Sequence, residues 1–216
     1  MSLNLVIDTS LNACTAALFD GERPLAERVE VMARGHQERL GVMVAELFEA
    51  AGVAPKDLGL IAVTLGPGSF TGLRVGLSFA KGLAVGLGVP LKGIGTLEAL
   101  GYHPELSGSR MSVIDGGRGQ IYAQLFEGGE GPIALSAESD FTPYQNIAVL
   151  TGPGAVLLEA HLPQARVFAQ DWPAPAALNA LAQAGHEDLT PIYMREADAK
   201  VSTRGVITLP GGALNA

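Results

Sequence analysis

The stretch GPGSFTGLRVG, residues 66–76, joins a predicted strand to a predicted helix and decides the fold. The six residues before it, 60–65, form an apolar run typical of a buried strand, and the glycine–proline–glycine triplet suits a tight turn. Ser69 then supplies a hydroxyl that can accept a hydrogen bond from an amide of the first helical turn. We therefore expect a helix that begins one or two residues after Ser69 and runs to about Leu87.

A glycine turn ahead of a helix is also found in phosphate-binding loops. The Walker A pattern needs Gly-Lys-Ser/Thr after the turn, whereas Lys81 of this chain lies deep in the predicted helix and precedes Gly82. The Rossmann pattern needs a glycine where Thr71 stands, and a nucleophile elbow needs one where Pro67 stands. The segment therefore favours a structural role, as a turn and a helix cap for close packing, over direct catalysis.

The composition favours a compact globular protein. The chain has 216 residues, of which 48% are hydrophobic and 17% charged, enough for one large domain or two lobes with a core. Its net charge of -8 argues against direct binding of a polyanion, so any RNA that the protein serves would have to be held by a partner. With Cys14 as the single cysteine and no leader at the N-terminus, we expect a cytoplasmic protein. The most apolar stretch, 70–87, carries Arg74 and Lys81 and is too polar to predict a membrane span.

Polar turns divide the first hundred residues into an ordered series of apolar segments. Residues 3–7 form a short strand that ends at Asp8-Thr9-Ser10, and residues 14–19 follow as a second strand. A third strand is expected at 24–32, and residues 37–52 show apolar side chains at helical spacing with a closing glycine. Together with the strand and helix around the glycine turn, the order is three strands, a helix, a strand and a helix.

The same order begins again in the second half of the chain. Residues 111–114 form an apolar run that ends at Asp115-Gly116-Gly117, and residues 120–126 follow as its partner strand. Two halves that each carry an aspartate at a strand end resemble the actin, sugar kinase and Hsp70 superfamily, whose hairpins face a nucleotide cleft. We therefore expect an α/β fold with two lobes on a repeated βββαβα plan.

The second copy of this plan is the smaller one. It contains a late strand at 147–150 and short helices at 156–160 and 175–184. We place a first actin-like lobe at 1–103, a reduced second lobe at 104–196, and a flexible tail at 197–216, where no clear periodicity remains.

Four segments resemble the TsaB (YeaZ) family, and together they span nearly the whole chain. They are Ile7 to Ser10 with Cys14 shortly after, Gly66 to Gly76, Asp115 to Tyr122, and Pro191 to Arg195. The glycine-turn segment is the specific one, since the aspartate hairpins alone indicate only the superfamily. The chain departs from the family at the second hairpin, where Asp115-Gly116-Gly117-Arg118 replaces the usual Asp-Ala-Arg-Arg.

The resemblance implies a role in making threonylcarbamoyladenosine in tRNA. Members of the TsaB family are degenerate relatives of TsaD, which transfers the threonylcarbamoyl group to adenosine 37, and they bind TsaD rather than perform the transfer. TsaD holds a metal through two histidines four residues apart. The matching helix start here has His36, but Leu40 at the second position cannot ligate. We therefore expect no catalytic group, no metal site, and a surface position for His36.

We expect the function to lie on a surface formed by the two helices of the first lobe. The helix at 70–87 has more apolar area than one sheet face can cover, and two of its glycines are one turn apart, which would let another helix approach. Two helices from each of two related subunits would form a four-helix interface. The resemblance implies TsaD as this partner, TsaE as a further one, and a homodimer when TsaD is absent. The alternative is that both helices only complete the core. The predicted contact residues are Val42, Ala45, Gly72, Val75, Gly76, Phe79 and Leu83.

The two aspartate hairpins form a candidate nucleotide cleft. Its predicted residues are Asp8, Thr9, Ser10, Asp115, Gly116 and Gly117, which could position Mg²⁺ and the phosphates of ATP or ADP. The alternative is that Asp8 only bonds the amides of its own turn, and the absence of a lysine from both loops favours it. We therefore expect no cofactor.

Two enzyme hypotheses stay open beside the binding role. One is a small-molecule kinase of the same superfamily, and the other is a glycoprotease-like peptidase. A peptidase needs a metal pair or a nucleophile with a nearby base, and the sequence shows neither.

Overall fold

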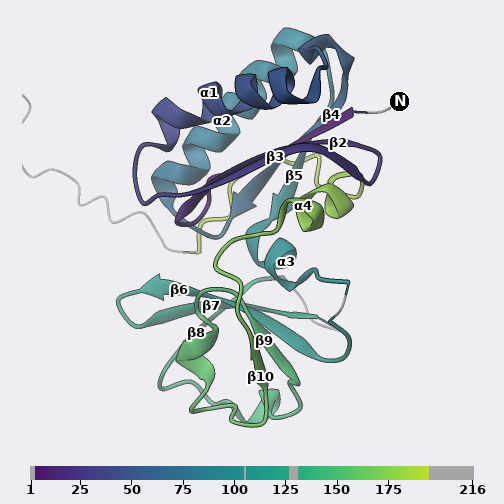
Figure 1. The fold of residues 1–216 in the computed structure, drawn as a ribbon. Coiled ribbons are helices and arrows are strands. Elements are labelled where there is room, and N and C mark those ends of the chain that lie inside the picture. Colours follow the sequence, from purple (N-terminus) through teal and green to yellow (C-terminus); the bar gives the residue numbers. More distant parts are fainter. Residues whose placement is uncertain (1–2, 105, 127–130, 195–216) are drawn as a thin grey trace, which may run out of the picture.

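The computed structural model describes residues 3–104, 106–126 and 131–194, so the predicted tail at 197–216 lies outside the described residues. Two five-stranded sheets form two lobes, which lie one above the other in Figure 1. The short helix α3 (Thr96–Gly101) lies between them. The predicted two-lobed α/β arrangement is thus confirmed.

The first sheet is mixed, with strand order β3-β2-β1-β4-β5. Its central strand β1 pairs antiparallel with β2 and parallel with β4. The predicted order of three strands, helix, strand and helix is confirmed, whereas β5 and α3, which follow it, were not predicted. The strands are β1 (Leu3–Asp8), β2 (Ala13–Asp20), β3 (Arg23–Val31), β4 (Leu58–Gly66) and β5 (Leu91–Gly95).

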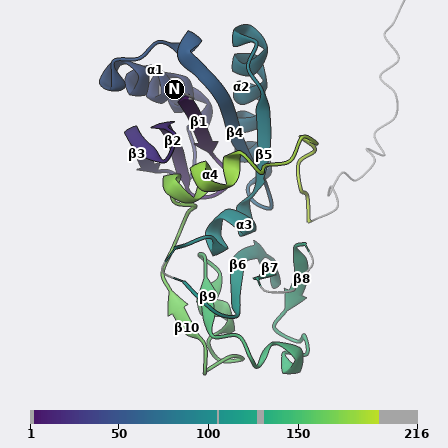
Figure 2. The same cartoon turned by 90° about the vertical axis from the view of Figure 1, so that its right-hand side faces the viewer.

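Helices cover both faces of this sheet, as Figure 2 shows. On one face, α1 (His36–Ala51) and α2 (Phe70–Leu87) pack on Leu5 and Ile7, which alternate along β1 with Val6. On the other face, Val6 contacts α3 and α4 (Pro175–Ala182) through a second apolar cluster. Because side chains of a strand point alternately to its two faces, burial on both explains the apolar run 5–7 in the middle of β1.

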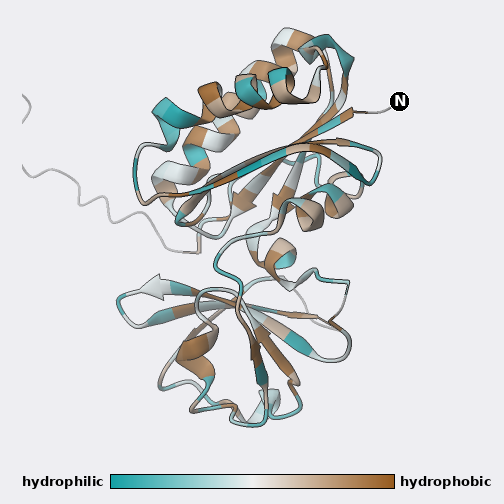
Figure 3. Cartoon of the chain, viewed as in Figure 1, coloured by the Kyte–Doolittle hydropathy of each residue, from teal (hydrophilic) through white to brown (hydrophobic). Residues whose placement is uncertain are grey.

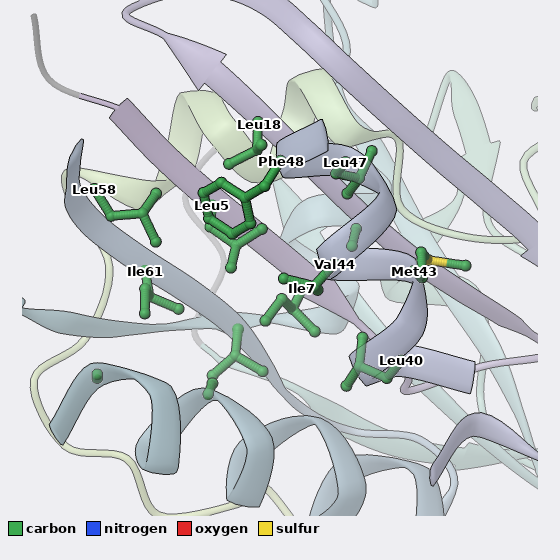
Figure 4. Close-up of a cluster of buried hydrophobic side chains, with 14 of the residues drawn as sticks. Leu5, Ile7, Leu18, Leu40, Met43, Val44, Leu47, Phe48, Leu58 and Ile61 are labelled. Atoms are coloured by element: carbon green, nitrogen blue, oxygen red, sulfur yellow. The ribbon is translucent and has the colours of Figure 1, made fainter. Parts of the chain in front are cut away.

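Apolar side chains of α1 point into the first face of the sheet (Figure 4). Leu40, Met43 and Leu47 are each no more than 1% exposed, and they meet residues of β1, β2 and β4. The helix ends at Gly52, whose φ of 65° is left-handed and favours glycine. The predicted helix at 37–52 is therefore confirmed to within a residue at each end.

The predicted cap of α2 is also confirmed. The Ser69 hydroxyl accepts a hydrogen bond from the Gly72 amide at 3.2 Å, and the helix runs from Phe70 to Leu87. Figure 3 shows few hydrophilic residues along this helix. Among the residues that the structure describes, no helix is long and apolar enough to cross a membrane.

The second sheet repeats the plan with less helix. Its order is β10-β9-β6-β7-β8, with β6 paired antiparallel to β7 and parallel to β9. The glycine–proline–glycine triplet recurs at 152–154, after β9, but only a short 3₁₀ turn (Ala155–Leu158) follows it. The strands are β6 (Arg110–Gly117), β7 (Gln120–Phe126), β8 (Ile133–Ser136), β9 (Val149–Thr151) and β10 (Arg166–Phe168). The helix predicted at 156–160 is this 3₁₀ turn.

The end of the described chain returns to the first lobe, which differs from the predicted boundary. Helix α4 was assigned to the second lobe, yet Leu178 and Ala182 pack against the first sheet. Beyond it, His186 and Gly93 exchange two backbone hydrogen bonds of 2.8 and 2.9 Å, and the Ile192 amide donates to the Leu65 carbonyl at 2.7 Å. The physical reason is that β1 and β4 present an apolar face that α3 and α4 cover.

Candidate functional site

The first aspartate hairpin is closed inside the first lobe. Asp8 Oδ1 accepts three hydrogen bonds, from the Ser10 amide at 3.0 Å, the Ser10 hydroxyl at 2.5 Å and the Thr64 hydroxyl at 2.6 Å. The Thr9 hydroxyl donates to the Gly72 carbonyl at 2.8 Å. All these side chains are buried, and the three hydroxyl groups and Asp8 Oδ1 are paired within the lobe.

Burial also sets the acidity of this carboxyl group. It raises the pKa of Asp8 above its ordinary value, although the hydrogen bonds from Ser10 and Thr64 oppose the shift. Asp8 Oδ2 is buried with no hydrogen-bond partner among the described residues. A carboxyl group that is fully buried and tied to its own turn does not fit a Mg²⁺–phosphate site, which needs exposed carboxylate oxygens.

The aspartate of the second hairpin is exposed, whereas that of the first is buried. Asp115 is exposed, and its Oδ1 accepts a hydrogen bond from the Gly117 amide at 2.7 Å. A Cβ on Gly116 would lie 2.8 Å from the Tyr122 ring and 3.0 Å from the Gln120 carbonyl, so close packing at the end of the β6–β7 hairpin favours glycine there.

A cavity of about 1150 Å³ lies between the two lobes. Of the six predicted cleft residues, Ser10, Asp115 and Gly116 line it, whereas Asp8, Thr9 and Gly117 do not. The other lining residues include Leu11, Asn12, Val31, Pro67, Gly68, Ser69, Phe70, Arg74, Ile114, Tyr122, Pro153, Asp171, Trp172, Ile192, Tyr193 and Met194.

A second hollow, of about 580 Å³, lies on the outer side of α1 and α2. Val75 and Phe79, both predicted contact residues, line it, together with Gln37, Leu40, Phe70, Thr71, Arg74 and Ser78. Of the other predicted residues, Val42 is 53% exposed and Ala45 is exposed, while Leu83 is half-buried. We call the surface formed by Val42, Ala45, Val75, Phe79 and Leu83 the helical face.

Gly72 and Gly76 do not belong to this face, which corrects their predicted role. Both are buried, and a Cβ on Gly72 would collide with the Thr9 carbonyl oxygen, while one on Gly76 would collide with the Thr9 hydroxyl. The two glycines therefore bring α2 onto the first hairpin instead of admitting a helix from outside. Gly41 of α1, which is exposed and whose Cβ would lie 3.6 Å from the Phe79 ring, is a glycine on the outer side.

The position predicted for His36 is also wrong. It begins α1 as expected, but it is only 8% exposed, and its Nε2 has no hydrogen-bond partner among the described residues. In the same lobe Cys14 is fully buried, and burial raises the pKa of its thiol to about 11. A thiol that stays protonated is a poor nucleophile.

Sequence reasoning missed the aromatic side chains that surround the cavity. The rings of Phe70 and Tyr193 are in contact, tilted by 41° with their centres 5.1 Å apart, and the Arg74 guanidinium lies 3.8 Å from the centre of the Phe70 ring. Trp172 comes from the connection between β10 and α4. Tyr193 lies in the Pro191–Arg195 segment already noted, but no sequence signal singles out Trp172.

Comparisons with known proteins find relatives that are named for threonylcarbamoyladenosine biosynthesis in tRNA. The family model of TsaD, tRNA N6-adenosine threonylcarbamoyltransferase, matches residues 29–188. An uncharacterized Mycobacterium leprae protein is 35% identical over 213 residues, which cover 94% of this chain and 57% of that protein. The Bacillus subtilis tRNA threonylcarbamoyladenosine biosynthesis protein TsaB is 36% identical over 126 residues, covering 57% of this chain and 54% of that protein.

A solved structure extends the likeness over the fold. YeaZ from Pseudomonas aeruginosa superposes with a TM-score of 0.75 at 27% identity, covering 90% of this chain and 100% of that chain. The resemblance drawn from the four segments and the actin-like fold are both confirmed. The chain spans little more than half the length of the two curated relatives above.

Proposed function

The chain belongs to the TsaB (YeaZ) family, and from this membership and the helical face we propose that it is a non-catalytic subunit in the biosynthesis of threonylcarbamoyladenosine in tRNA. In this proposal it binds and activates a TsaD partner through α1 and α2, offers a surface to TsaE, and leaves tRNA to TsaD. A homodimer uses the same face when TsaD is absent. The setting is the cytoplasm.

The apolar exposure of the helical face carries the proposal. Val42 on α1 is 53% exposed, and Phe79 and Val75 on α2 line the hollow between the two helices. Exposed apolar residues on adjacent helices are the usual basis of a helix-bundle interface, which stably buries roughly 1,600 Å² in total. The core alternative accounts for part of this face, because Val75, Phe79 and Leu83 also pack against the core of the first lobe, but it does not account for Val42 and Ala45, which are exposed.

The chemistry of the described residues supports a non-catalytic role. No group of three or more His, Cys, Asp or Glu among them could hold a metal ion, and Leu40 occupies the position four residues after His36. Cys14 and Asp8 are both fully buried, so neither presents a nucleophile or a base to a substrate. No observation favours the peptidase hypothesis, and burial of Asp8 weighs against the kinase hypothesis.

The charge of the chain supports indirect contact with tRNA. A net charge of -8 opposes association with a phosphate backbone, whose binding depends on Lys and Arg contacts. A cationic partner subunit would therefore hold the RNA.

A matched pair of surface valines tests the proposal. Val42 and Val156 are 53% and 60% exposed, the first on the helical face and the second in the second lobe. Each is changed to Glu, co-expressed with TsaD from the same organism, and analysed by size exclusion with light scattering. We expect Val42→Glu to abolish or strongly weaken the complex and Val156→Glu to leave it intact. Equal complexes from both variants, or none from the wild type, would contradict the assignment of the helical face.

A second variant checks the half-buried part of the face. Val75→Glu combined with Phe79→Glu places two charges in the hollow between α1 and α2. Circular dichroism shows whether this variant folds. A folded variant that still binds TsaD as the wild type does would argue against the hollow as a contact.

A further inference from the structure

The cavity between the lobes collects aromatic side chains from four separate segments. Phe70 begins α2, Tyr122 lies in β7, Trp172 joins β10 to α4, and Tyr193 follows α4. The whole chain has only seven Phe, four Tyr and one Trp, so a large share of its aromatic content meets at this one place. Such clustering is typical of a ligand pocket, which is mostly apolar and aromatic with a few polar groups.

Phe70 and Tyr193 form an exposed aromatic platform. The two residues are 49% and 43% exposed, and their rings lie 5.1 Å apart between centres, tilted by 41°. Arg74 lies over the Phe70 ring, and its Nε donates a hydrogen bond to the Tyr193 hydroxyl at 3.4 Å. A planar molecule that covers these rings would remove apolar surface from water and add stacking contacts.

The backbone holds this platform in place before any ligand arrives. The residue before Tyr193, Ile192, donates its amide to the Leu65 carbonyl at 2.7 Å, at the end of β4. Phe70 is fixed by the capped start of α2. Because these two residues would lose little conformational entropy on binding, the platform suits a small rigid ligand.

The charges of the lining oppose a phosphate group. Asp115 and Asp171 are exposed carboxylates on the wall, and Arg74 is the one cationic side chain among the described lining residues. Arg74 already contacts Phe70 and Tyr193. At the start of α2, the Ser69 amide donates to the Ser10 carbonyl and the Gly72 amide donates to the Ser69 hydroxyl, so these two amides are taken.

We propose that the interlobe cavity binds a small planar aromatic molecule without phosphate, seated on Phe70 and Tyr193 and favoured by a positive charge near Asp115 and Asp171. The volume of about 1150 Å³ is ample for a molecule of two fused rings. This site shares Phe70 and Arg74 with the hollow between α1 and α2, but its other lining residues lie elsewhere, and it goes beyond the proposed function.

The single tryptophan allows a direct test. In a ¹⁵N-labelled protein, one indole N–H signal reports Trp172 at the cavity wall. The probes share one ring system: 1-naphthylmethylamine, 1-naphthylmethanol and 1-naphthyl phosphate. We expect saturable shifts of this signal, tightest with the amine and weaker by at least about tenfold with the phosphate. A phosphate ester that binds as tightly as the amine would overturn the proposal.

Two tyrosine variants locate the binding. Tyr193 and Tyr102 are 43% and 40% exposed, but only Tyr193 lines the cavity. We expect Tyr193→Ala to weaken amine binding about fivefold and Tyr102→Ala to leave it unchanged. Equal affinities of the two variants for the amine would refute the assignment of Phe70 and Tyr193 as the binding surface. The proposal is also wrong if no probe moves the signal while a TsaD partner does, because the cavity is then part of the subunit interface.

Discussion

The two aspartate hairpins share a sequence plan but differ in their surroundings. Both follow the central strand of a five-stranded sheet, β1 in the first lobe and β6 in the second. Asp8 is fully buried and accepts three hydrogen bonds, whereas Asp115 is exposed and accepts one from its own turn. A shared motif therefore fixes the backbone path, while the elements packed above the strand end decide whether the carboxylate can meet a ligand.

Helix α2 makes the difference between the hairpins. Gly72 and Gly76 of this helix pack against Thr9, and the Thr64 hydroxyl of β4 donates a hydrogen bond to Asp8. In the second lobe Gly154 lies against the backbone of Ile114 and Asp115, but a short 3₁₀ turn follows it instead of a long helix. The side chain of Asp115 is left at the cavity wall.

The largest expected effect comes from separating α2 from the first hairpin. In Gly72→Ala the new Cβ would collide with the Thr9 carbonyl oxygen, and we expect a loss of about 3 kcal/mol of unfolding free energy. The control is Gly82→Ala in the same helix, where nothing lies within 4 Å and a gain of about 0.5 kcal/mol is expected. Urea denaturation followed by circular dichroism measures both. Equal stabilities would mean that α2 is not held against Thr9.

The same substitution in the second lobe sharpens the comparison. A Cβ on Gly154 would lie 2.7 Å from the Ile114 carbonyl carbon and 2.8 Å from the Asp115 amide nitrogen. We expect Gly154→Ala to cost about 2 kcal/mol in the same denaturation experiment. A neutral result would show that close glycine packing matters only in the first lobe.

Removing the buried carboxyl group should cost about as much as Gly154→Ala. Asp8→Ala leaves the Ser10 amide, the Ser10 hydroxyl and the Thr64 hydroxyl without their acceptor, and we expect a loss of about 2 kcal/mol. If Thr64→Val restores part of this loss in the double variant, the cost comes from unpaired donors. Additive losses would contradict that explanation.

The pH dependence of stability tests the state of the same group. Because burial raises the pKa of Asp8 above its ordinary 3.8, the folded protein keeps a proton that the unfolded chain releases. The stability from this group is therefore fully present below about pH 3.8 and falls as pH rises through the folded pKa. We expect Asp8→Asn to remove a slope of up to about 1.4 kcal/mol per pH unit, measured by urea denaturation between pH 3.5 and 8. Parallel curves for variant and wild type would rule out the raised pKa.

The smallest effect is expected at the second hairpin. Asp115→Ala removes one exposed hydrogen bond to the Gly117 amide, and we expect a change below about 0.5 kcal/mol. A loss as large as that of Asp8→Ala would break the contrast between the hairpins.

The sequence predicted the local structure well because local signals control it. The serine cap, the extent of α2 and the three leading strands follow from turn residues and apolar spacing. Strand β5 was missed because its five residues, LKGIG, contain two glycines and a lysine and give no apolar run.

The candidate site was less predictable because it depends on packing between distant segments. Spacing places Gly72 and Gly76 on one side of α2 but does not say that this side meets Thr9. The burial of His36 and Asp8 likewise depends on neighbours far along the chain. Trp172 reaches the cavity only because the chain crosses back to the first lobe after β10.

The return of the chain to its first lobe has a consequence for synthesis on the ribosome. Asn4 donates to Asn179 across 175 residues at 2.9 Å, and α4 covers one face of the first sheet. This face of the first sheet lacks α4 until the whole second lobe has been translated. We therefore expect the second lobe to finish folding before the first lobe does, although the first lobe is synthesised first.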